Sequence, residues 1–161
     1  MSEEFIVRPF PKSLNVKFKK LENYPEEFYT NGLPEYETTG SSGFDIRADK
    51  DYCIQTNGTA LVKTGFSVAV PEGYELQIRS RSGLALKKSV FVLNGVGTVD
   101  SDYRSEIGVI LHNSGENEFT IEKGDRIAQG VIVPIIKSNF QVVDELETTE
   151  RNGGFGSTGV R

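Results

Sequence analysis

The sequence has very little of the residue types that build disulfides, zinc sites and nucleophilic catalytic pairs. Cys53 is its only cysteine, His112 is its only histidine, and it has no tryptophan. A disulfide framework, or a zinc site with several Cys and His ligands, therefore cannot form within one chain. The same scarcity argues against a Ser-His or Cys-His nucleophile pair. For any metal, we expect a hard, oxygen-bound ion such as Mg²⁺.

The single cysteine and the single histidine each have a simple structural interpretation. Cys53 stands in the run Tyr52-Cys53-Ile54, and we expect a core residue there. His112 stands at the apolar run from Ile107 to Leu111, so we expect a packed strand residue rather than a catalyst.

A basic excess and long apolar runs are also missing. The net charge of −5 disfavours non-specific binding of nucleic acid, which relies on basic surfaces. No apolar run approaches the roughly 18 residues of a membrane span, and the first residues lack the pattern of a secretory signal. We therefore expect a cytoplasmic protein without nucleic-acid or membrane partners. A phosphorylated small molecule would need a local basic pocket.

What the sequence does contain is strict alternation of apolar and polar residues, which predicts half-buried strands. At 161 residues, 37% of them hydrophobic, the chain is long enough for a single sizeable core. Turn signals separate the segments, and their spacing predicts an all-β sandwich or jelly roll. One short helix is expected from Ser82 to Lys88. The expected strands include Leu14–Phe18, Phe66–Val70, Tyr74–Ile78, Glu106–Leu111, Glu118–Glu122, Arg126–Ile135 and Phe140–Asp144.

The stretch from Leu93 to Gly108 concentrates the chemistry. Asn94-Gly95 between apolar residues predicts a tight β-hairpin, since both residues accept the positive φ that such turns need. Asp100, Asp102 and Tyr103 follow closely, so a carboxylate stands near an aromatic ring. This combination could hold a small polar ligand and a water molecule, and either carboxylate could activate that water.

This stretch resembles the hairpin of the homotrimeric dUTP pyrophosphatases, or dUTPases, with the pattern N-x-V-G-x-I-D-S-D-Y-x-G-x-I-G. Five blocks in family order are far more specific than any single motif. The resemblance implies a jelly-roll-like β-barrel and three active sites at the subunit interfaces of a homotrimer. The other four blocks are Gly40–Ala48, Arg81–Ala85, Gly124–Gln129 and Arg151–Gly159.

The implied reaction is Mg²⁺-dependent hydrolysis of dUTP to dUMP and pyrophosphate, which keeps uracil out of DNA and supplies dUMP for dTMP synthesis. By the resemblance, Asp100 is the catalytic residue that activates the attacking water, Asn94 reads uracil, and Tyr103 packs against the deoxyribose. The backbone groups along the base and sugar would come from Gly97, Thr98 and Val99, while Gly108 would permit close approach.

The phosphate-binding residues implied by the resemblance lie in other blocks. Arg81, Ser82 and Gly83 match the phosphate-binding turn, where Ser80 replaces the family's usual proline. Gln129 matches a phosphate ligand of the fourth block. Asp45 matches the aspartate that supports the magnesium ion through water.

The last implied element is a glycine-rich arm, residues 148–161, that closes over an active site beside a barrel domain of residues 1–147. Arg151 and Phe155 stand one residue closer together than in the family's R-G-x-G-G-F. Phe155 would stack on uracil. Arg151, Ser157 and Thr158 would meet the phosphates, and Gly156 between them would also belong to the substrate-binding residues.

Two rival functions remain at this point. The related dCTP deaminases share the fold and a triphosphate site, but their pattern lacks the V-D-S-D-Y hairpin. A nucleotide-switched regulatory binding protein on the same fold is the other rival. Residues 22–39, which we interpret as a long surface connection, could then be a partner surface.

Overall fold

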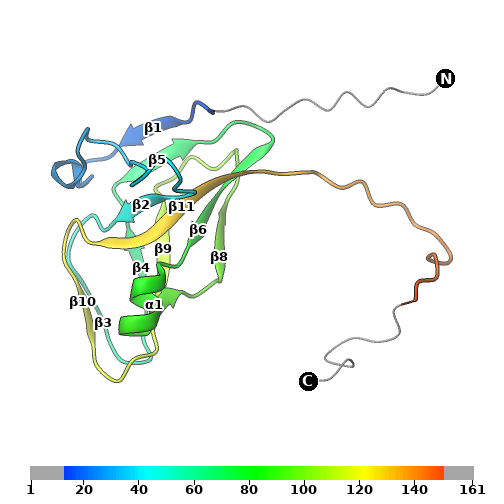
Figure 1. Cartoon of the computed structure of the whole chain (residues 1–161). Helices are drawn as coiled ribbons and strands as arrows, with labels where there is room; N and C mark the ends of the chain where they lie inside the picture. The colour runs from blue at the N-terminus through cyan, green and yellow to red at the C-terminus, as the bar shows by residue number, and fades with distance from the viewer. Residues whose placement is uncertain (1–12, 151–161) are drawn as a thin grey trace.

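The computed structural model describes residues 13–150, and these fold mainly into β-strands (Figure 1). The jelly-roll-like, all-β fold predicted from the sequence is confirmed, with one short α-helix, α1 (Ser82–Lys88). The strands are β1 (Lys17–Lys20), β2 (Phe44–Arg47), β3 (Tyr52–Ile54), β4 (Thr59–Lys63), β5 (Phe66–Ala69), β6 (Tyr74–Arg79), β7 (Val90–Val92), β8 (Val96–Val99), β9 (Gly108–Asn113), β10 (Phe119–Ile121) and β11 (Arg126–Pro134).

Two larger sheets frame the core. One has the strand order β2-β11-β6-β8 and the other the order β4-β9-β7, and the pairs β1-β5 and β3-β10 complete the barrel. Alternation explains the packing: on β9, Val109 and Leu111 are buried while Ile110 between them faces outward. The same core cluster takes Leu76 and Ile78 from β6. Each such side chain contributes about 1.5–3 kcal/mol on burial.

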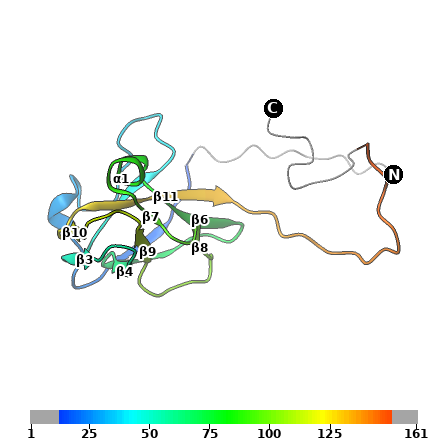
Figure 2. The same ribbon diagram turned by 90° about the horizontal axis from the view of Figure 1, so that it is seen from below.

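Most of the expected strands are present, with ends shifted by one to three residues. The expected strand Phe140–Asp144 is wrong, because the described chain after β11 contains no strand, and it runs away from the barrel (Figures 1 and 2). A strand needs a neighbour for its backbone groups, and this segment has none among residues 13–150. The apolar side chains there are accordingly exposed: Ile136, Phe140, Val142, Val143 and Leu146.

The turn at Asn94-Gly95 is confirmed, but the hairpin is wrong. Gly95 has a φ of 73°, and its N–H donates to the Val92 carbonyl over 3.1 Å. The flanking strands do not pair with each other, however, because β7 pairs with β9 and β8 pairs with β6. The turn therefore carries the chain from one sheet to the other.

Of three smaller expectations, those for the helix and for His112 are confirmed and the one for Cys53 is wrong. The helix is found as expected, although Arg81 is its N-cap and Ser82 its first residue. His112 is a half-buried residue of β9, as expected, whereas Cys53 is exposed and the core assignment was wrong. Cys53 occupies the outward face of β3, whose inward face carries Ile54.

The segment 22–39 is more than a surface connection. It contains a 3₁₀ turn, η1 (Glu26–Phe28), and it buries Tyr24 and Tyr29, whose rings stack with centroids 5.4 Å apart. Burial raises the pKa of Tyr29 to about 12, so its phenol stays neutral under ordinary conditions.

Within residues 13–150, no helix is both long and apolar enough to cross a membrane.

Candidate active site

A pocket of about 230 Å³ opens beside β8 and collects residues that the sequence placed at the substrate. It is lined by residues of β6, β7, β8 and β9, of the turn before β8 and of the loop that follows β8. Seven expected site residues are among them: Asn94, Gly97, Thr98, Val99, Asp100, Tyr103 and Gly108. The fold thus brings together residues that lie between positions 94 and 108 of the sequence.

Asp100 is exposed and follows directly on β8, whose pairing with β6 fixes its starting point. Its carbonyl accepts a hydrogen bond from the Tyr103 N–H over 3.1 Å, which closes a tight turn. Asp102 takes another direction. It lines a separate, polar pocket with Lys17, Arg104 and other residues and does not line the pocket that holds Asp100. The sequence left open which of the two carboxylates could activate a water molecule, and the structure places only Asp100 in the pocket with Asn94 and Tyr103.

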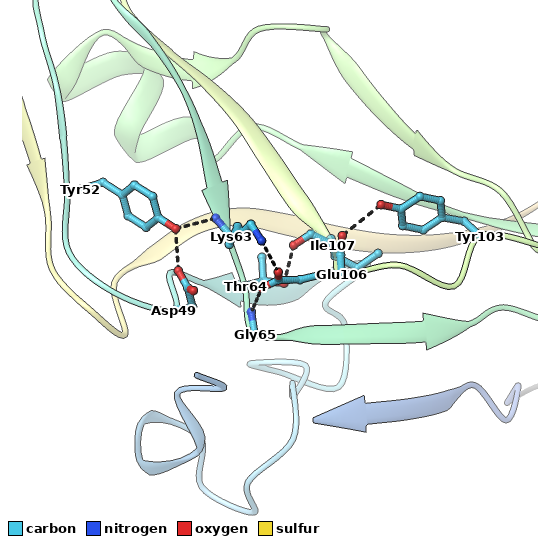
Figure 3. Close-up of polar contacts among 8 residues, drawn as sticks. All are labelled: Asp49, Tyr52, Lys63, Thr64, Gly65, Tyr103, Glu106 and Ile107. Atoms are coloured by element: carbon cyan, nitrogen blue, oxygen red, sulfur yellow. Dashed lines mark hydrogen bonds and ion pairs between the residues drawn. The ribbon is translucent and has the colours of Figure 1, made fainter. Parts of the chain in front are cut away.

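Tyr103 lines the pocket and is 42% exposed. Its hydroxyl donates to the backbone carbonyl of Glu106 over 3.1 Å, as Figure 3 shows. The ring is therefore fixed at its far end, while one face remains available to a ligand.

Two glycines allow neighbouring strands around this pocket to approach each other closely. A Cβ atom on Gly97 would lie 3.0 Å from Cβ of Ile78 and 3.4 Å from Nδ2 of Asn94. A Cβ on Gly108 would lie 2.7 Å from Cδ1 of Leu61 on β4. Side chains at either position would push these walls apart.

A second group of expected residues surrounds Arg81, at the start of α1. Nε of Arg81 lies 3.4 Å from Oδ1 of Asp45, and its Nη1 donates to the Arg126 carbonyl over 3.0 Å. Nη1 of Arg126 lies 3.2 Å from Oδ2 of Asp45. Gln129 is the register partner of Asp45 and is exposed. Two guanidinium groups thus converge on one carboxylate beside the expected phosphate turn.

These two groups do not form one cavity within the chain. None of Arg81, Ser82, Gly83 and Gln129 lines the pocket that holds Asp100. The other expected site residues lie outside the described range: Arg151, Phe155, Gly156, Ser157 and Thr158.

The pocket also has an apolar wall that motif reasoning missed. This wall consists of side chains from β6, β7 and β9 and from the residue before β9: Ile78, Val92, Ile107, Val109 and Ile110. The alternation of these strands marked most of them as core residues, and nothing in the sequence distinguished the core from the lining of a pocket. The ion pair of Arg126 with Asp45 was also not expected from the sequence.

The comparisons with known proteins agree with this geometry. The family model for dUTPase matches residues 31–159. The chain belongs to the dUTPase family. The deoxyuridine 5'-triphosphate nucleotidohydrolase of Caulobacter vibrioides is 48% identical over 155 residues, which cover 93% of this chain and 97% of that protein. A variant of the Staphylococcus bacteriophage 80alpha dUTPase, solved with dUpNHpp, superposes with a TM-score of 0.80 at 27% identity and covers 92% of this chain and 100% of its own.

Magnesium is named for one structural relative. A variant of the dUTPase from phage phi11 of S. aureus, described with a structural Mg(II) ion, has a TM-score of 0.73 at 24% identity and covers 84% of this chain and 100% of its own. In the part of this dUTPase-family chain that the structure describes, no three or more His, Cys, Asp or Glu residues gather as a metal site. Asp45 offers a single carboxylate, already paired with two arginines. These donors fit an ion held mainly by substrate phosphates and water, as Mg²⁺ commonly is.

Proposed function

We propose that this dUTPase-family chain is a dUTP diphosphatase that uses Asp100 as general base for water attack at the α-phosphorus of dUTP. The observation that carries the proposal is the pocket in which Asp100, Asn94 and Tyr103 meet. Asp100 is exposed at its rim, so a water molecule can reach the carboxylate. A carboxylate within hydrogen-bond reach of that water accepts its proton as the P–O bond forms. Pyrophosphate then leaves and dUMP remains.

The walls of the same pocket account for selection of the nucleoside. The Asn94 amide carries both a donor and an acceptor for the edge of uracil. Gly97, Thr98 and Val99 supply backbone groups along the base and sugar. The Tyr103 ring lies against C2′ of the sugar, where a ribose hydroxyl would collide with it. Gly108, packed on Leu61, keeps this side of the pocket open.

The triphosphate is bound by the residues around α1. Ser82 offers a hydroxyl, Gly83 exposes its backbone, and the open space around Gly83 leaves room for phosphate oxygens. Arg81 and Gln129 add a charge and an amide, and a guanidinium suits phosphate oxygens. Asp45 would hold Mg²⁺ through water, and the ion would supply further positive charge to the phosphates. The arm would close over this site with Arg151, Phe155, Gly156, Ser157 and Thr158.

A homotrimer would unite the pieces that one chain keeps apart. The pocket beside β8 and the phosphate turn share no cavity within one chain, so a site made from neighbouring subunits would complete both. The segment 135–150 supports self-association, because Phe140 and Val142 are each 97% exposed within it. Apolar side chains in such number are typical of an interaction site. The cytoplasm, where deoxynucleotides serve DNA synthesis, is the expected location.

The rival functions are less well supported. The curated relative at 48% identity is named for hydrolysis of deoxyuridine triphosphate, which favours hydrolysis over deamination of dCTP. Among residues 13–150, no contact points to a role as a nucleotide-switched regulator in place of catalysis.

The decisive experiment is turnover of dUTP by the purified protein in H₂¹⁸O, with Mg²⁺ or with EDTA, and with UTP and dCTP as controls. We expect dUMP and pyrophosphate from dUTP, little product from UTP, and loss of turnover in EDTA. Attack at the α-phosphorus places ¹⁸O in dUMP. Label in pyrophosphate would place the attack at the β-phosphorus, and dUTP formed from dCTP would support the deaminase.

A further inference from the structure

The loop that carries Asp100 and Tyr103 has few ties to the barrel. In the described part of the chain, every hydrogen bond made by residues 100–105 stays between positions 100 and 106. Arg104 donates only to carbonyls of this loop, those of Ser101 and Tyr103. The position of the loop therefore depends on the residues at which it rejoins the barrel.

Glu106 is the first of these residues, and its side chain reaches away from the loop (Figure 3). Its Oε1 accepts a hydrogen bond from the Gly65 N–H over 3.0 Å, and its Oε2 pairs with Nζ of Lys63 over 2.8 Å. Its backbone carbonyl is the acceptor for the Tyr103 hydroxyl. One residue thus holds the turn between β4 and β5 with its side chain and the Tyr103 ring with its backbone.

The next residue strengthens this attachment. The Ile107 N–H donates to the Phe66 carbonyl over 2.9 Å, and the buried Thr64 hydroxyl donates to the Ile107 carbonyl over 2.8 Å. Glu106 and Ile107 are therefore bonded to four consecutive residues, 63–66.

The turn itself is a firm support. Gly65 has a φ of 72°, and a Cβ there would lie 2.5 Å from Cα of Tyr24, so the turn packs directly against that backbone. The Gly65 carbonyl also accepts a hydrogen bond from the Leu21 N–H over 2.8 Å. On the other side, the Lys63 N–H donates over 3.0 Å to the hydroxyl of Tyr52, which in turn donates to Asp49. Glu106 also raises the pKa of Lys63, through its hydrogen bond and its negative charge, so the lysine stays charged.

We propose that Glu106 is a positioning residue for sugar selection: by gripping the β4–β5 turn, it fixes the carbonyl that holds the Tyr103 hydroxyl and so holds the ring where it excludes a ribose 2′-hydroxyl. This inference rests on the proposed role of Tyr103. A ring released from this anchor can rotate away from the sugar. UTP then fits better, and dUTP loses a wall of its pocket.

The test compares kcat and KM for dUTP and UTP in Glu106→Ala, Glu106→Gln, Tyr103→Phe and the double variant E106A/Y103F. Glu106→Ala removes both contacts to the turn, and we expect kcat/KM for UTP relative to dUTP to rise about tenfold, mainly through KM for dUTP. Glu106→Gln keeps an oxygen for the Gly65 N–H, so it should restore the ratio to within about threefold of the wild type. The double variant should exceed the stronger single variant very little, because both act through one ring.

Glu27→Ala is the matched control, since it removes an ion pair with Lys123 of the same 2.8 Å length away from the pocket. It should leave the ratio unchanged. If Glu106→Ala fails to fold, Glu106→Asp, which is too short to reach both partners, serves the same test. A lowered melting temperature with a wild-type UTP-to-dUTP ratio would show that Glu106 only braces the fold and would overturn the inference. An unchanged ratio in Tyr103→Ala would instead overturn the role of Tyr103 itself.

Discussion

The barrel and the segment 135–150 show the same kind of sequence pattern with opposite outcomes. On β9, alternation places Val109 and Leu111 in the core, whereas Phe140 and Val142 of the later segment are each 97% exposed. The difference lies in the neighbours: β9 is flanked by β4 and β7, and the segment has no partner within residues 13–150. Apolar alternation therefore indicates that a segment can bury one face. Whether that face is buried depends on the surface that packs against it.

The same contrast divides the candidate site. The barrel places Asp100 and Tyr103 in one pocket, whereas none of the residues of the expected phosphate turn lines that pocket. We therefore expect changes in the pocket to act within one chain, and changes in residues 135–161 to act through the assembly.

The largest effect is expected inside the barrel's own pocket. Asp100→Asn should lower kcat for dUTP by about 10² to 10⁴, because an amide cannot accept the proton of the attacking water. Binding of a non-hydrolysable dUTP analogue, measured by calorimetry, should be kept. The matched control is Asp102→Asn, two residues away in a separate pocket, which should retain most of its activity. The reverse result would transfer the catalytic role to Asp102.

Next in size are two truncations that separate the arm from the exposed segment. Deletion of residues 151–161 should leave the barrel folded and the assembly intact, yet reduce turnover strongly, because it removes the arm that we propose as a lid to exclude water. Phe155→Ala should reproduce a smaller part of this defect, since stacking on a base is worth roughly 1–3 kcal/mol. Deletion of residues 135–161 should in addition convert the assembly to monomers. Sedimentation and thermal unfolding distinguish the two outcomes, and a fully active 1–150 chain would show that no lid is needed.

A third prediction measures the core directly. Leu111→Ala on β9 should lower the free energy of unfolding by about 2–5 kcal/mol, because it leaves a cavity in a packed core. Leu111 is fully buried. Chemical denaturation at several protein concentrations measures this loss, and a loss below 1 kcal/mol would mean that the core relaxes around the cavity.

The smallest effect on the barrel is expected from Val142→Ser in the exposed segment. A surface change of this kind usually alters the free energy of unfolding by less than about 0.5 kcal/mol. If the segment packs on another chain, however, the midpoint of assembly should move to higher protein concentration. An unchanged midpoint would mean that Val142 takes no part in self-association.

The sequence predicted the parts of the fold that depend on local pattern. Alternation located strands such as β6 and β11, and a short stretch of motif located the residues that meet at the pocket. The sequence could not predict which strands pair with one another. The Asn94-Gly95 turn was correct, but the choice of β9 and β6 as partners of the flanking strands depends on contacts far away in the sequence.

The site shows the same division. Motifs named Asp100 and Tyr103, because the chemistry of those side chains is visible in the sequence. Glu106 was not named, because an exposed-looking glutamate in a strand-like run carries no signal of the two donors that its carboxylate meets. Contacts of this kind follow from the packing of the β4–β5 turn beside β9.

Cys53 has a practical consequence. It is the only thiol of the chain and lies exposed on β3, so each subunit can carry one spectroscopic label at one defined place. In a ring with threefold symmetry, three equivalent labels form an equilateral triangle, and pulsed electron resonance would record one separation. An open or asymmetric arrangement would give two or more. The number of distances between labels on this outward-facing thiol therefore reports whether the assembly is symmetric.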